Sequence, residues 1–172
     1  SDRLAAHAAL AAVLDGQPDR QAWHRAASVL GRDERVAEAL DQAASRARAR
    51  GATSISVSAL ERAANLTPDP ARRAERLLRA AELGFDMGNR DLVARLVRDA
   101  EPLTTFFNAP VAAGYMALVR GLGDTTPMQA SQVRSVVDLA QRAVDAGDAD
   151  LAWNLLWLAA QRCFWADPGE EA

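Results

Sequence analysis

Few side chains in this sequence could carry acid–base, nucleophilic or metal chemistry. The chain holds two histidines, His7 and His24, and one cysteine, Cys163. Neither histidine is spaced from another ligand as metal sites require, and Cys163 lies in an apolar stretch with Arg162 as its only basic neighbour. The sequence contains no lysine, whereas a phosphate-binding P-loop needs one. We therefore expect no enzymatic activity, no catalytic or metal-binding residue and no cofactor in this chain.

An arginine cluster is the first candidate binding feature: Arg72, Arg73, Arg76 and Arg79. Such a cluster could bind an anion. Glu75 and Glu82, however, lie three or four residues from these arginines, a spacing that favours weak pairs along one helix. We interpret the cluster as a solvated helix face rather than an anion site.

The last apolar segment carries two stripes at helical spacing. The first, which we expect to pack on the preceding helix, consists of Ala152, Leu156, Ala159 and Cys163. The second includes Trp153, Trp157 and Phe164, and these aromatics could expose on the order of 500 Å² of apolar surface. We predict an interaction surface there, which pairs with a second copy, binds another protein or is covered by the chain folding back. The alternative is a wall on which a ligand stacks.

A second candidate site lies where the helical pattern is interrupted. Its residues are Phe106, Phe107, Tyr115 and Arg120. Loops that interrupt a regular array often carry function, so we predict a pocket for a small-molecule effector there. Local core packing of the aromatic residues is the simpler alternative.

The composition indicates an all-α protein. Of the 172 residues 49% are apolar, mostly alanine and leucine, and all 20 basic residues are arginine. Alanine, leucine, arginine and glutamate are strong helix formers. The net charge of −3 argues against general nucleic-acid binding. No segment is apolar and long enough for a membrane span, and the single cysteine fits a reducing compartment, so we expect a cytoplasmic protein.

Helix start and stop signals divide the chain into about nine helices. We expect them at about residues 2–14, 19–30, 33–50, 53–66, 70–87, 91–101, 109–122, 128–146 and 148–165. Asp33 is the expected N-cap of the third helix, Thr53 or Ser54 that of the fourth, and Asp148 or Asp150 that of the ninth.

Three glycine corners share the same surroundings. Gly51, Gly88 and Gly147 each have an alanine seven residues before them and another twelve residues after them. Small residues at these places allow two antiparallel helices to approach closely. We expect one helical-repeat domain over residues 1–172, with N-terminal helices (1–50), the best-defined repeats (51–101), an irregular segment (102–127) and a final hairpin (128–166).

This arrangement resembles the tetratricopeptide repeat, a helical hairpin with small residues around its turn. The resemblance implies a stack of antiparallel helical hairpins, an α-solenoid. The intervals between successive glycines are unequal and both exceed the ~34 residues of the regular repeat. The repeats are therefore degenerate.

The order of four segments resembles one family over about residues 3–103, and more loosely afterwards. The segments 20–27, 33–40, 43–51 and 59–70 read RQAWHRAA, DERVAEAL, AASRARARG and ALERAANLTPDP. They resemble the middle of the large ATP-binding LuxR-type transcriptional regulators of actinobacteria. In that family a P-loop ATPase precedes this region and a DNA-binding helix-turn-helix follows it.

The resemblance implies that the chain is a fragment of a larger protein. Its role would be that of a non-catalytic sensor or protein-interaction region, which couples a ligand or partner to ATPase and DNA-binding domains outside it. The alternative is a free-standing tetratricopeptide-like scaffold that binds a peptide or protein.

Overall fold

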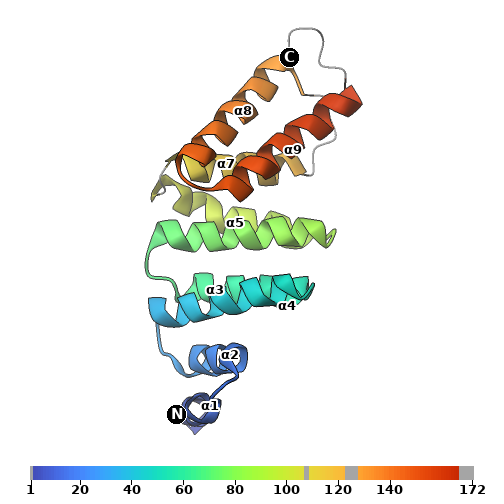
Figure 1. Ribbon diagram of the computed structural model, residues 1–172. Helices are drawn as coiled ribbons and strands as arrows, with labels where there is room; N and C mark the ends of the chain where they lie inside the picture. Colours follow the sequence, from blue (N-terminus) through green and yellow to red (C-terminus); the bar gives the residue numbers. More distant parts are fainter. Residues whose placement is uncertain (1, 107–108, 123–127, 167–172) are drawn as a thin grey trace. The chain divides into compact units, whose positions relative to one another are not determined.

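The computed structural model describes residues 2–106, 109–122 and 128–166, and these residues form helices and connections without a β-strand (Figure 1). The predicted all-α class is therefore confirmed for the described part of the chain. Within these ranges nine α-helices and a 3-10 helix (η1) follow in the order α1 (Asp2–Val13), α2 (Pro18–Ser28), α3 (Glu34–Ala49), α4 (Thr53–Leu66), α5 (Pro70–Asp86), α6 (Arg90–Ala100), η1 (Glu101–Phe106), α7 (Ala109–Leu122), α8 (Ala130–Asp145) and α9 (Ala149–Ala166).

The helices fall into two compact units, residues 1–103 and residues 104–172. In the first unit each helix packs on the next one in sequence, from α1 to α6. In the second unit α7, α8 and α9 all pack on one another. One domain was predicted over residues 1–172. The boundary between the two units falls near the start of the segment predicted to be irregular, 102–127.

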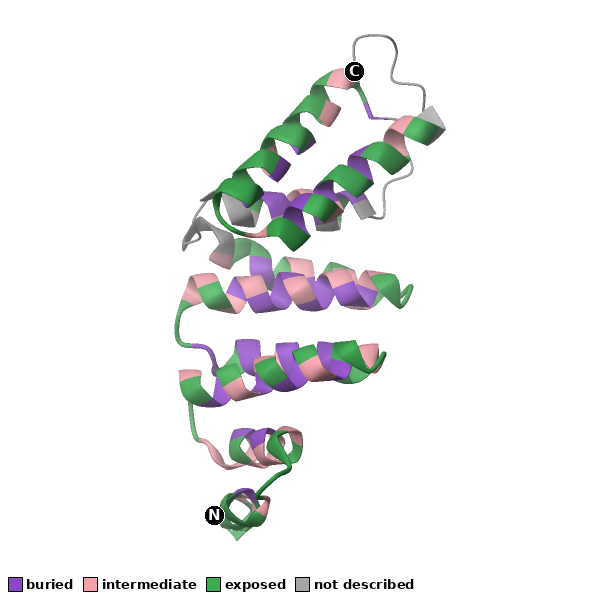
Figure 2. Ribbon diagram, viewed as in Figure 1, coloured by how far each residue is buried: buried purple, intermediate pink, exposed green. Residues whose placement is uncertain are grey.

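Burial in the first unit is concentrated in α3, α4 and α5 (Figure 2). A cluster of mostly small side chains joins α2, α3 and α4: Ala22, Ala26, Val36, Ala37, Leu40, Ala63 and Leu66. Small side chains allow the helix backbones to approach closely, so the core is made by contact between helices rather than by large aromatic residues. Helix α1, in contrast, buries only Ala11 among its residues.

One backbone geometry recurs at the three interhelical corners that follow α3, α5 and α8. Gly51, Gly88 and Gly147 have φ angles of 73°, 70° and 83°, a left-handed conformation that is costly for residues with a Cβ. At each corner the glycine N–H donates to the carbonyl three residues earlier, and the next N–H donates to the carbonyl five residues earlier. This bond pair is the Schellman motif, which satisfies the last carbonyls of a helix. The predicted corners are therefore confirmed.

At two corners the residue after the glycine also caps the next helix. The side chain of Asn89 accepts a hydrogen bond from the N–H of Leu92 at 3.1 Å. Asp148 accepts one from the N–H of Leu151 at 3.0 Å, which confirms Asp148 as the predicted cap. One residue thus ends one helix with its backbone and starts the next with its side chain.

The first corner lacks this side-chain cap, and two details of the sequence analysis are wrong near it. Ala52, rather than Thr53 or Ser54, occupies the N-cap of α4, because the helix already begins at Thr53. Further upstream α2 ends at Ser28 and not at about residue 30, so Leu30 lies beyond the helix and is 84% exposed.

The small residues that flank the corners are buried, as predicted. The six alanines at the shared positions are Ala44, Ala81, Ala140, Ala63, Ala100 and Ala159, and all are at most 5% exposed. The larger residue nine positions after each glycine varies more, since Leu60 is buried, Val97 is half-buried and Leu156 is 42% exposed. The prediction that Leu156 belongs to the packed stripe of α9 is therefore wrong.

The close approach of α7 and α9 explains why the buried face of α9 is shifted. A Cβ placed on Gly114 would lie 3.0 Å from Leu151, and one placed on Gly121 would lie 2.6 Å from Leu158. These glycines lie on one face of α7, and α9 packs its leucines against that face. The buried stripe of α9 accordingly contains Leu151, Leu155 and Leu158 together with the predicted alanines.

Candidate interaction surfaces

The residues predicted as an interaction surface form an exposed aromatic face on α9. Trp153, Trp157 and Phe164 are 67%, 57% and 81% exposed, and Leu156 adjoins them at 42%. We call these four residues the aromatic face. Their spacing of three, four and seven residues places them along one side of the helix. That they bind a partner stays a prediction.

Two residues of the aromatic face can be compared with residues at the same positions in the α3–α4 hairpin. Trp153 and Leu156 lie six and nine residues after the third corner glycine. The residues at the same positions after the first corner glycine are Val57 and Leu60, which are 3% and 1% exposed. They lie on α4, which packs against both α3 and the following helix α5. Two of the four residues of the aromatic face, Trp153 and Leu156, thus stand at positions that are buried in the α3–α4 hairpin.

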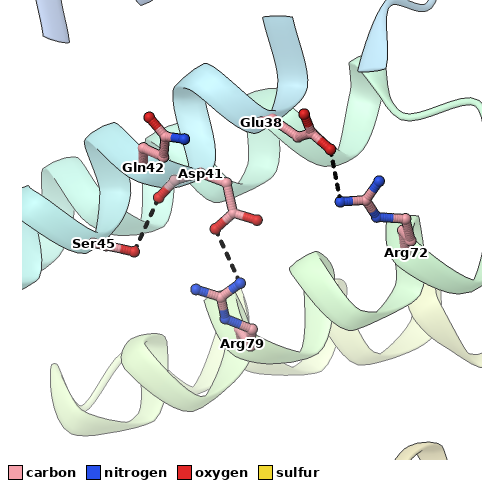
Figure 3. Close-up of a pocket in the computed structure, with 6 residues that line it drawn as sticks. All are labelled: Glu38, Asp41, Gln42, Ser45, Arg72 and Arg79. Atoms are coloured by element: carbon pink, nitrogen blue, oxygen red, sulfur yellow. Dashed lines mark hydrogen bonds and ion pairs between the residues drawn. The ribbon is translucent and has the colours of Figure 1, made fainter. Parts of the chain in front are cut away.

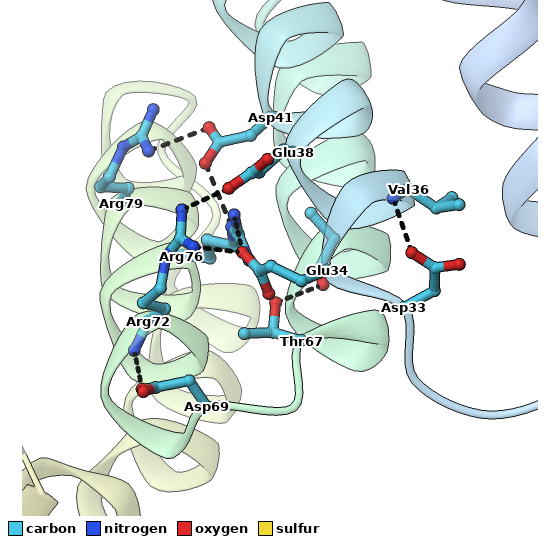
Figure 4. A network of polar contacts seen from close by, with 11 residues as sticks. Asp33, Glu34, Val36, Glu38, Asp41, Thr67, Asp69, Arg72, Arg76 and Arg79 are labelled. Carbon is cyan, nitrogen blue, oxygen red and sulfur yellow. Dashed lines mark hydrogen bonds and ion pairs between the residues drawn. The ribbon is translucent and has the colours of Figure 1, made fainter.

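A charged network joins α3 to α5 (Figure 4). We define it by three carboxylates on α3 and three guanidinium groups on α5: Glu34, Glu38, Asp41, Arg72, Arg76 and Arg79. The two helices are separated in sequence by α4, so these long side chains connect successive hairpins of the first unit.

Arg76 is the centre of the charged network and is only 2% exposed. Its Nη2 lies 2.9 Å from Oε1 of Glu34, and its Nε lies 3.1 Å from Oδ2 of Asp41. Its Nη1 also donates to the hydroxyl of Thr67, at the end of α4. Burial alone would lower the pKa of Arg76, but the hydrogen bonds that Arg76 donates to Glu34 and Asp41 outweigh burial and raise its pKa. Arg76 is therefore a buried, fully charged connector.

The outer arginines complete the charged network. Arg72 lies 2.8 Å from Glu34 and 3.0 Å from Glu38, and Arg79 lies 2.9 Å from Asp41. The interpretation of this cluster as a solvated face is wrong for Arg76, because the carboxylates that bind it come from another helix. Three positive groups face three negative groups, so the network has no excess charge with which to hold a free anion.

A polar cleft of about 350 Å³ lies beside the charged network (Figure 3). Its lining consists of Glu38, Asp41, Gln42, Ser45, Arg72 and Arg79. The charged residues of the lining already bind one another across the cleft, as the dashed lines in Figure 3 show. The cleft is therefore suited to neutral polar groups, such as the backbone of a peptide, rather than to an ion.

A smaller ion-pair group joins α2 to α3. Asp19 accepts from Arg46 at 2.7 Å and from Arg50 at 3.0 Å. Burial raises the pKa of Asp19. The hydrogen bonds from the two arginines lower this pKa by more than burial raises it, so the carboxyl titrates below its ordinary value. These ion pairs connect the C-terminal end of α3 to the first turn of α2.

The predicted effector pocket is only partly within the described structure. Phe107 lies outside the described residues, and for Phe106 and Tyr115 the description covers the backbone alone. Arg120 lines a cleft of about 290 Å³ between α7, α8 and α9, together with Arg162 and residues such as Met128 and Val136. Its lining combines polar and apolar side chains, as the lining of small-molecule sites commonly does.

The two histidines lie together, which their separation of 17 residues gave no reason to expect. Nδ1 of His7 on α1 is 2.9 Å from Nδ1 of His24 on α2. Cys163 is a free, partly exposed thiol on α9. Over residues 2–106, 109–122 and 128–166, no group of three or more His, Cys, Asp or Glu side chains is placed to hold a metal ion.

No helix in the described part of the chain combines the length and the apolar character that a membrane crossing requires. In comparisons with protein families, with curated proteins and with solved structures, none of the three gives a match to this chain.

Proposed function

We propose that this chain is a non-catalytic protein-interaction region, in which the aromatic face of α9 binds an apolar helix of a protein partner. The observation that supports this proposal is the exposure of Trp153, Trp157 and Phe164 along one side of a helix that is otherwise packed. Aromatic residues are enriched at protein interfaces and depleted on free surfaces. Trp153 and Leu156 match positions of the α3–α4 hairpin that are buried, and this match indicates a helix as the occupant.

The simplest occupant to test is a second copy of the chain. The aromatic face supplies on the order of 500 Å² from each copy, and a symmetric pair would bury about twice that area. Stable protein interfaces bury about 1,200–2,000 Å² in total. Self-association through this face alone is therefore weak, and a partner that also covers the neighbouring α8 would bind more tightly.

Sedimentation velocity over a wide concentration range tests this proposal. We expect the wild-type chain to shift reversibly from monomer toward dimer at high concentration, and Trp157→Asp to stay monomeric, because a carboxylate cannot be buried in an apolar contact. Leu30→Asp is the control, since Leu30 is also an exposed apolar residue but lies in the first unit. The control should behave like the wild type.

Two results would contradict self-association. One is a wild-type chain that remains monomeric at every concentration, and the other is a dimer that Trp157→Asp leaves intact. In the first case a protein partner remains to be tested, by comparing capture of one purified candidate helix by the wild type and by Trp157→Asp.

The wider role that we propose is that of the sensor region of a cytoplasmic LuxR-type regulator, and its support is the sequence resemblance over residues 3–103. In such a protein the helical array would couple partner or ligand binding to an ATPase and a DNA-binding domain. Reading the gene on both sides of this segment tests it: a P-loop upstream and a helix-turn-helix downstream are expected, and a short independent reading frame would refute it.

A ligand role is supported by the cleft that Arg120 lines. Titration with small-molecule effectors, followed by tryptophan fluorescence, should give saturable changes that Arg120→Gln weakens. The competing function is a free-standing scaffold that binds a peptide, and the polar cleft beside the charged network favours it. If the scaffold function is correct, a Glu38→Ala variant should weaken peptide binding and leave the fluorescence response to small-molecule effectors unchanged.

A further inference from the structure

The histidine contact lies in the least buried part of the first unit. His7 and His24 are both partly exposed, and their ring centroids are 5.1 Å apart with a tilt of 34° between the planes. Helix α1 packs mainly on α2, and it buries only Ala11. Besides the histidine contact, the side chain of Gln21 on α2 donates a hydrogen bond of 2.9 Å to the carbonyl of Ala11 on α1.

The distance between the two ring nitrogens fits a shared metal ion. Imidazole nitrogens bind transition metals at about 2.0 Å. Two such nitrogens that are 2.9 Å apart subtend an angle of about 90° at the metal. That is the angle between neighbouring ligands in square-planar and tetragonal sites, which copper(II) and nickel(II) prefer.

We infer that His7 and His24 form a two-imidazole site for a tetragonal divalent metal ion, with copper(II) as the tightest-binding member of the series. Without metal the two Nδ1 atoms are at hydrogen-bonding distance, and both partly exposed rings turn by roughly 45° to direct their lone pairs toward a common ion. Water completes the coordination, because the described residues supply no third side-chain ligand. The bound metal remains exchangeable.

Metal binding at this position would fasten α1 to α2. In the absence of metal, α1 packs on α2 with Ala11 as its one buried residue and with two polar contacts between side chains or backbone of the two helices. A metal ion held by one ligand from each helix binds the docked state and not the separated one, so it stabilises docking by mass action. The site therefore links metal binding to the order of the N-terminal helix.

Copper(II) titration by calorimetry and electron paramagnetic resonance tests the inference. The background is Cys163→Ser, because a free thiol reduces copper(II) and competes for it. We expect one copper(II) ion per chain, with hyperfine splitting from two nitrogens. His7→Gln and His24→Gln should each weaken binding at least tenfold, since loss of even an indirect ligand contact costs about 10–100-fold. Arg20→Gln, on the exposed side of α2, is the control and should keep the stoichiometry and the spectrum.

The inference is wrong if both histidine variants bind copper(II) as tightly as the parent, or if the spectrum lacks nitrogen splitting from two imidazoles. His7 lies on α1, outside the densely buried helices, so the His7→Gln variant keeps the core intact, which circular dichroism verifies. Hydrogen exchange of α1 amides supplies the second readout. Copper(II) should slow this exchange in the parent protein and leave it unchanged in His7→Gln, and equal exchange with and without copper(II) in the parent would refute the docking link.

Discussion

Nη2 of Arg76 on α5 lies 2.9 Å from Oε1 of Glu34 on α3, although 42 residues separate the two in sequence. Arg76 is almost completely buried, whereas Glu34 keeps a quarter of its side-chain surface exposed. A buried guanidinium is stable only when its donors are satisfied, and three groups from two preceding helices satisfy them here. This relationship fixes how successive hairpins of the first unit lie on each other.

Replacement of Arg76 should therefore destabilise the protein strongly. We expect Arg76→Met to lower the free energy of unfolding by about 3 kcal/mol. Glu34 and Asp41 then lose their buried partner and keep only the more exposed Arg72 and Arg79. Arg72→Ala, at a site where the side chain is 48% exposed, should cost at most about 1 kcal/mol. Urea denaturation measures both. Equal losses from the two variants would show that burial of Arg76 does not decide its contribution.

The stability cost of substituting a corner glycine should depend on its backbone conformation and not on steric clashes. No atom lies within 4 Å of a Cβ built on Gly88, so Gly88→Ala creates no clash. Its φ of 70° nevertheless disfavours alanine, and we expect a loss of about 1 kcal/mol. Gly88→Asn should cost less, because asparagine adopts this conformation more readily. Thermal unfolding compares the two, and the opposite order would contradict the argument.

The contact between α7 and α9 should depend on Gly121. A methyl group there would lie 2.6 Å from Leu158, so Gly121→Ala should destabilise the second unit by about 1 kcal/mol even though alanine favours helix. Shortening the side chain at position 158 tests whether contact with Leu158 causes this loss. In the background of Leu158→Ala, the same change at Gly121 should become neutral or stabilising. Additive effects in this double-mutant cycle would refute direct contact as the cause.

The ion pairs of Asp19 should make stability dependent on pH. Because the folded-state pKa of Asp19 is lowered, its stabilisation is complete above the unfolded value of 3.8 and is lost as the pH falls through the folded value. Wild type should therefore exceed Asp19→Asn in stability at about pH 7, by up to about 1 kcal/mol. The difference should shrink toward about pH 3. A difference that is constant with pH would exclude titration of Asp19 as its source.

The aromatic face shows how far helical spacing can predict a surface. The spacing of Trp153, Trp157 and Phe164 correctly placed them on one exposed side of α9. It did not place Leu156, which was assigned to the packed stripe. The direction of a stripe depends on which helices pack against it, and the contact with α7 through Gly114 and Gly121 rotates the buried side of α9 toward Leu151 and Leu158.

The sequence by itself determined the helices, the three corners and the small residues around them. These features depend on local physics: the left-handed conformation of Gly51, Gly88 and Gly147, side-chain capping by Asp33 and Asp148, and helical periodicity all act within a few residues. Such rules can be applied without knowing which helices meet.

The tertiary structure alone decided the partners of charged and titratable side chains. Arg76 was expected on a solvated face and is buried against Glu34 and Asp41, and His7 meets His24 at 2.9 Å. Both contacts join different helices, so they depend on the angle and offset at which the helices pack. Those quantities arise from the sum of many small contacts along the interface, and no local pattern of residues encodes them.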